Sequence, residues 1–153
     1  MKLSESPDYK IAVFASVNGE LDEAKEAYER LLDQAESNDD DVAISFLMQS
    51  LANVEARMGN LKLGQELHLR AIGQSFGIPL NLIVYAKSLV EHFDDPQLAE
   101  QKLIEAESLI KSDKWNQRVD NITPESYAQQ IAEVRAAIKN TTTEHTEITE
   151  NPS

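Results

Sequence analysis

The chain has 153 residues, with 27 acidic and 14 basic side chains and no cysteine. Its net charge of −13 excludes a surface that binds nucleic acid through phosphate contacts, and it disfavours docking on an anionic membrane. The absence of cysteine excludes disulfides and thiolate metal sites. A hydrophobic fraction of 41% is sufficient for a folded core, and the length fits one domain.

The N-terminal segment is polar, and no apolar run approaches the roughly 20 residues that a membrane helix needs. These features predict a cytoplasmic protein without a membrane partner. The negative charge would attract a basic protein or peptide as partner, but charge alone is better explained by solubility.

Helix-forming residues dominate the composition, and only five glycines and five prolines interrupt it, which predicts an all-α fold. Residues 1–7 are expected to be a flexible lead-in, and the Thr- and Glu-rich residues 140–153 a disordered tail. Apolar residues in steps of three and four predict helices at about 8–18, 21–35, 42–58, 61–76, 79–93, 96–110 and 124–139.

Particular residues support these boundaries. In the first helix, Ile11, Phe14, Ala15 and Val17 recur at helical spacing, and Ala12 is expected to be a small contact residue. Thr123, followed by Pro124, is a favourable start for the last helix. The connector before that helix is expected to pack through its tryptophan, the only one in the chain.

The second predicted helix and the loop after it are strongly acidic. Residues 20–41 hold ten acidic residues against two basic ones, which leaves a local net charge of −8. One aspartate of the loop 37–41 is expected to cap the following helix. A calcium loop is disfavoured there, because the spaced ligands, central glycine and terminal glutamate are missing.

Small residues recur along the chain where paired helices must touch, most clearly Ala52, Gly64 and Ala71 around the turn at Gly59-Asn60. Three series of positions repeat with spacings of 40 and then 34 or 35 residues: Ala12, Ala52 and Ala86; Ala24, Gly64 and Ala99; Leu31, Ala71 and Ala106. The turns at Gly19-Glu20, Gly59-Asn60 and Asp94-Asp95 fall in step with them.

This pattern resembles the tetratricopeptide repeat family, whose helix–turn–helix unit is about 34 residues long. The resemblance implies one α-solenoid domain over 8–139, with pairs at about 8–35, 42–76 and 79–111 and a capping helix at about 124–139. The chain departs from the family in lacking the early tryptophan of each first helix and the third turn glycine. A helical bundle without repeats is the alternative.

The resemblance implies a non-catalytic interaction module, an adaptor or chaperone-like protein that binds a peptide or helix in the concave groove. Transferred by position, the groove would be lined by Tyr9, Val13, Ser16, Gln49, Asn53, Arg57, Ile83, Lys87 and Val90. The cations with which some members clamp a terminal carboxylate are missing, so that ligand is rejected.

A self-associating module, with a homodimer as its product, is the alternative function, and it would expose a large apolar patch. A helical enzyme is disfavoured. His68, His92 and His145 form no metal-binding pair, and no phosphate loop or nucleophile elbow is present. We therefore expect no catalytic residue, no metal and no cofactor.

Overall fold

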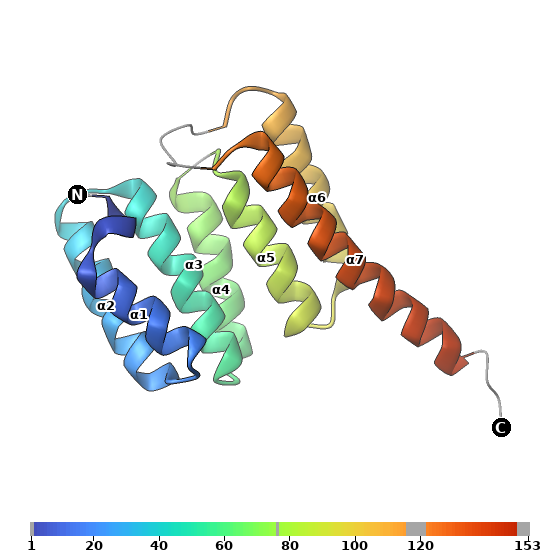
Figure 1. Ribbon diagram of the computed structural model, residues 1–153, viewed down its shortest axis with the longest axis horizontal. Coiled ribbons are helices and arrows are strands. Elements are labelled where there is room, and N and C mark those ends of the chain that lie inside the picture. Colours follow the sequence, from blue (N-terminus) through green and yellow to red (C-terminus); the bar gives the residue numbers. More distant parts are fainter. Residues whose placement is uncertain (1, 76, 116–121, 150–153) are drawn as a thin grey trace. The chain divides into compact units, whose positions relative to one another are not determined.

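The computed structural model describes residues 2–75, 77–115 and 122–149 (Figure 1). These residues form α-helices and one short 3-10 helix, without a strand, so the predicted all-α fold is confirmed. The chain divides into two compact units, Met1–Phe76 and Gly77–Ser153, where the sequence predicted one domain. None of the described helices is both long and apolar enough to cross a lipid bilayer.

The first unit is a series of antiparallel helices in which each helix packs against the next along the chain. Its elements are a 3-10 helix Leu3–Glu5, α1 Pro7–Val17, α2 Leu21–Ser37, α3 Asp41–Arg57 and α4 Leu61–Gln74. These bounds agree with the predicted helices to within two residues at every end.

Left-handed residues end the first three helices at intervals of twenty positions, with φ of 78° at Gly19, 50° at Asp39 and 91° at Gly59. After each of them, the next amide donates to a carbonyl five residues earlier, at 2.9–3.0 Å. This is the Schellman arrangement, which satisfies the last carbonyls of a helix. The sequence indicated the two glycines but not Asp39, because an aspartate in this conformation has no distinct sequence pattern. The neighbouring Asp40 caps α3 as expected, accepting from the Ala43 amide at 3.1 Å.

The N-terminal segment differs from the predicted flexible lead-in. Leu3 is partly buried against the hydrophobic core of the first unit. The Ser6 hydroxyl accepts a hydrogen bond from the Tyr9 amide at 3.4 Å, so Ser6 caps α1. A capping serine followed by Pro7 was the available signal for this helix start.

α3 and α4 approach each other closely at the small residues predicted to touch. Ala52 and Ala71 have no exposed surface. A β-carbon added at Gly64 would lie 3.1 Å from the Ala52 carbonyl oxygen and 3.2 Å from the Ala56 amide nitrogen. The predicted contact is confirmed, and it leaves no room for a side chain at Gly64.

The apolar residues expected along α1 are buried only in part. Ala12 and Ala15 are buried, whereas Ile11, Phe14 and Val17 are 60%, 68% and 77% exposed. α1 packs on α2 with the side that carries Ala12 and Ala15, so Ile11, Phe14 and Val17 lie outside. Helical periodicity could not predict this, because α1 is apolar on most of its circumference.

The second unit contains α5 Pro79–Glu91, α6 Pro96–Lys111 and α7 Pro124–Thr149, and α7 packs against both other helices. Each helix begins with a proline, whose missing amide proton is no loss in the first turn. Asp94, in the turn between α5 and α6, takes a left-handed conformation with φ of 50°.

The connection to α7 contains both features that the sequence predicts. Trp115 packs edge-on against Tyr127, with ring centroids 5.8 Å apart, and the Thr123 hydroxyl accepts from the Ser126 amide at 3.1 Å. Both the packed tryptophan and the threonine cap are thereby confirmed.

The predicted disordered tail is replaced by helix over residues 140–149, so the predicted end of α7 at Lys139 is wrong. The segment contains no glycine or proline between Pro124 and Pro152, and therefore nothing in it ends a helix. The last four residues of the predicted tail, 150–153, lie outside the described residues.

Arg135 joins α7 to α6 by a forked pair of ion pairs. Its Nη2 lies 2.8 Å from Glu100 Oε1 and 2.6 Å from Glu107 Oε1, and Nε and Nη1 donate to the same two carboxylates. The hydrogen bonds to Glu107 and Glu100 raise the pKa of Arg135, and the guanidinium lowers the pKa of the Glu107 carboxyl. All three side chains are more than one-third exposed, so solvent screens this cluster.

Replacing Arg135 with alanine is expected to destabilise the second unit by about 1 kcal/mol at low salt and by less at high salt. Arg135→Lys should recover only part of the loss, because an ammonium cannot reproduce the guanidinium fork. Urea unfolding followed by Trp115 fluorescence at two ionic strengths measures both effects. Full recovery by lysine would show that charge alone matters.

Candidate protein-binding surfaces

Six of the predicted groove residues lie on α1 and α3, and the structure brings part of this set together. Arg57 Nη1 on α3 donates to the Ser16 hydroxyl on α1 at 3.0 Å. Val13 on α1 is partly exposed, with 36% of its area accessible. Asn53 on α3 is half-buried. The hydrogen bond between Arg57 and Ser16 therefore links α3 to α1.

Two other members of the set have little surface open to a ligand, since Gln49 is buried and Tyr9 is half-buried. The Tyr9 ring is half-buried and stands edge-on to Tyr28, with centroids 6.3 Å apart. Burial raises the pKa of Tyr9, and a hydrogen bond with Ser50 offsets this only in part. Gln49 is 8% exposed, and its Oε1 has no hydrogen-bond partner among the described residues. Tyr9 therefore packs against Tyr28 as part of the helix contact between α1 and α2.

The three remaining predicted residues, Ile83, Lys87 and Val90, line one cleft of about 270 Å³ between α5 and α7. They come from one side of α5, where helical spacing places positions three and four apart next to each other. The other lining residues are Val84 and Glu91 on α5 and Gln130, Glu133, Val134 and Ala137 on α7. The structure thus brings together every predicted groove residue of the second unit.

The cleft combines an apolar interior with a polar border. Ile83 and Val134 are almost fully buried at 2% and 6% exposure, whereas Lys87 and Glu91 are exposed and approach each other to 3.9 Å. The volume lies just below the roughly 300–1,000 Å³ of typical small-molecule pockets. These properties suit a few apolar side chains of a partner better than a whole small molecule.

Sequence analysis did not assign any α7 residue to this cleft. Tyr127, Ile131, Val134 and Ile138 recur at helical spacing along α7, and this pattern predicts burial but not which helix lies opposite. Only the packing of α7 against α5 makes Gln130, Glu133 and Ala137 part of this cleft.

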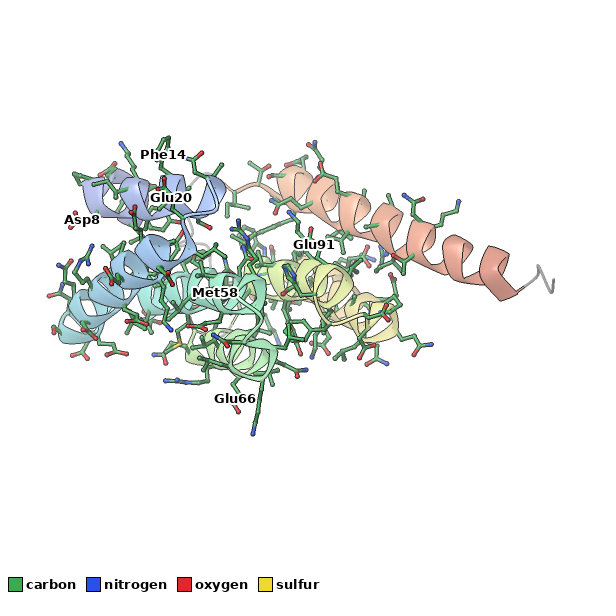
Figure 2. All side chains as sticks on the ribbon, turned by 90° about the horizontal axis from the view of Figure 1, so that it is seen from below. Asp8, Phe14, Glu20, Met58, Glu66 and Glu91 are labelled. Atoms are coloured by element: carbon green, nitrogen blue, oxygen red, sulfur yellow. The ribbon has the colours of Figure 1, made fainter. Side chains whose placement is uncertain are left out.

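A second surface that the sequence did not predict is the outer side of α1. Eight large hydrophobic residues of the described chain are exposed, and half of them lie on this one helix: Ile11, Val13, Phe14 and Val17. Figure 2 shows Phe14 on the outer side of α1. The others are scattered over α4 and α6, so α1 alone presents a concentrated apolar side.

The most buried carboxylate of the first unit is Glu55, whose side chain is 1% exposed. Lys25 on α2 approaches Glu55 Oε1 to 2.8 Å, and Asn60 Nδ2 donates to Oε2 at 2.6 Å. Burial raises the pKa of Glu55, but the hydrogen bonds from Lys25 and Asn60 outweigh it, so the net pKa is lowered. Glu55 is thus held ionised as the connection between α2, α3 and the following turn, and it is not available as a general acid.

In the part of the chain that the structure describes, no group of three or more histidine, aspartate or glutamate side chains could hold a metal ion. His68, one of the three histidines, lies on α4 and is buried at 1% exposure. It packs in the interior of the first unit.

Comparison of the chain with protein-family models, with curated proteins and with solved structures returns no match in any of the three.

Proposed function

We propose that this protein is a non-catalytic, cytoplasmic interaction module that binds a peptide or helix of a partner protein in the cleft between α5 and α7. The observation that carries the proposal is that Ile83, Lys87 and Val90, selected by repeat position alone, line the same cleft. The apolar interior would take the partner's side chains, and the polar border would set the orientation of its backbone.

The tetratricopeptide-like arrangement of helix pairs is part of this proposal. Its support is that all nine small or apolar positions of the three repeated series are buried. Glycine or aspartate adopts a left-handed conformation at each of the three corresponding turns. A repeat built from helix pairs buries these positions by packing each pair on its neighbours.

The charge of the cleft border indicates what the partner carries. Glu91 and Glu133 stand against the single cation Lys87, in a chain whose net charge is −13. A partner segment with apolar side chains and a basic residue would be attracted both by the border and by the field of the whole chain. We therefore propose a short basic, amphipathic segment as the ligand class.

The test uses the two neighbouring alanines of α7, both exposed, of which only Ala137 lines the cleft. Ala137→Arg should fill the cleft, whereas Ala136→Arg carries the same charge and the same helix propensity on another side. Peptides enriched on the intact chain from a displayed random-peptide library should contain basic and apolar residues. Their affinity should fall roughly tenfold or more with Ala137→Arg and change little with Ala136→Arg.

Each other result speaks against the proposal. If no peptide family is enriched on a folded chain, peptide binding is wrong. If enriched peptides bind both arginine variants equally, the binding surface lies elsewhere. Circular dichroism of both variants confirms that helix content is unchanged before affinities are compared.

A further inference from the structure

The cleft between α5 and α7 is lined by the sides of two helices, and this determines which groups it offers to a partner. All of its lining residues lie beyond the first turn of α5 or of α7. Their amide protons are therefore bonded to carbonyls four residues earlier in the same helix. The lining residues thus offer a partner their side chains but no backbone N–H group.

The polar side chains that α7 contributes to the border already have partners on their own helix. Gln130 Nε2 donates to the Ser126 hydroxyl at 3.4 Å, and Glu133 Oε1 accepts from Gln129 Nε2 at 3.4 Å. The amide group of Gln130 would have to leave Ser126 before it could donate to the backbone of a ligand.

The border on α5 has the same character. Lys87 approaches Glu91 to 3.9 Å, and the second carboxylate oxygen of Glu91 lies 3.8 Å from His92 Nε2. An extended segment brings one amide donor and one carbonyl acceptor per residue, and each such group that is buried without a partner loses its hydrogen bonds to water. A helix satisfies these groups internally. The cleft therefore suits a helical ligand better than an extended one.

The length of the cleft also matches a short helix. Its lining residues run from Ile83 to Glu91 on α5 and from Gln130 to Ala137 on α7. At a rise of 1.5 Å per residue, these walls are about 12 Å and about 11 Å long, which is about two helical turns. A partner helix of that length places side chains at positions i, i+3 or i+4, and i+7 towards the apolar interior.

We propose that the cleft takes its partner as an amphipathic α-helix, with the apolar residues of the helix in the cleft and basic residues beside Glu91 and Glu133. The charge of these two carboxylates against the single cation Lys87 selects the basic residues. This inference rests on the proposed function and adds the conformation of the ligand.

The test uses peptides enriched on the intact chain from the displayed library, restricted to those whose binding is weakened by Ala137→Arg. Their apolar positions should recur in steps of three and four. Proline at a central position between the apolar ones should weaken binding about 100-fold, because proline in a helix interior costs about 3 kcal/mol. Alanine at the same position is the matched control and should change the affinity less than about twofold.

A second measurement follows the conformation directly. The far-UV circular dichroism of the saturated complex should show more helix than the sum of the separate chain and peptide. Peptides that alternate apolar and polar residues, that bind equally well with proline and with alanine, or that gain no helix would overturn this inference and leave the proposed function intact. If no peptide is enriched on the folded chain, the proposed function is wrong and the inference is wrong with it.

Discussion

Replacing Gly64 with leucine is expected to lower the free energy of unfolding by about 3 kcal/mol, at the upper end of the typical penalty for overpacking a core. The added β-carbon alone would come within 3.1–3.3 Å of two backbone atoms of α3 and of the Ala56 β-carbon. Backbone atoms of a packed helix cannot move aside separately, so α3 and α4 must separate. Urea unfolding followed by far-UV circular dichroism measures the loss.

Gly73 provides the matched control, since it lies in the same helix with nothing within 4 Å of an added β-carbon. Gly73→Ala should stabilise the chain by about 0.5–1 kcal/mol, because alanine has the higher helix propensity. A Gly64→Leu variant as stable as the wild type would contradict the close approach of α3 and α4.

Removing Lys25, the cation of the ion pair with the buried Glu55, should also lower the free energy of unfolding substantially. Lys25→Ala leaves the Glu55 carboxylate buried with Asn60 as its remaining partner. Breaking a fully buried pair costs about 3–5 kcal/mol. Since the Lys25 side chain is 34% exposed, we expect a smaller loss of about 2–3 kcal/mol at neutral pH. Lys62→Ala, an exposed lysine on α4, should change stability little.

The direction of the Glu55 pKa shift predicts how this loss depends on pH. The folded-state pKa is lowered, so ionised Glu55 contributes stability above its unfolded value of about 4.3. That contribution disappears as the pH falls through the lower folded-state pKa. In Lys25→Ala, burial instead favours the protonated carboxyl. The difference between wild type and variant should therefore shrink as the pH falls through the carboxyl range around 4.3, relative to the Lys62→Ala control. A difference independent of pH would contradict this account.

Local chemistry explains why most helix boundaries could be predicted. Gly19 and Gly59 end helices because their left-handed conformation is accessible to glycine, and Thr123 starts one because its hydroxyl accepts an amide. These effects act within four or five residues. The predicted end of the last helix was wrong for a related reason. The composition of residues 140–149, rich in Thr and Glu, resembled that of a disordered segment, although it contains no glycine or proline to end a helix.

The sequence predicted the residues of the cleft that lie on α5, but not those on the opposite helix. The repeat spacing selected Ile83, Lys87 and Val90 on α5, but the opposite wall of the cleft comes from α7, some forty to fifty residues later. No periodicity within α7 distinguishes Gln130 or Ala137 as neighbours of α5. Their role depends on which face of α7 packs against α5.

The all-α class, the helix order and the small contact positions around Gly64 were determined by the sequence itself, because they follow from local propensity and from side-chain size. The exposure of Ile11, Phe14 and Val17 was decided by tertiary structure alone. α1 is apolar on most sides, and its packing on α2 buries Ala12 and Ala15 and leaves these three side chains outside. Which apolar residues remain outside, available to a second molecule, is therefore a property of the packed helices and not of the sequence pattern.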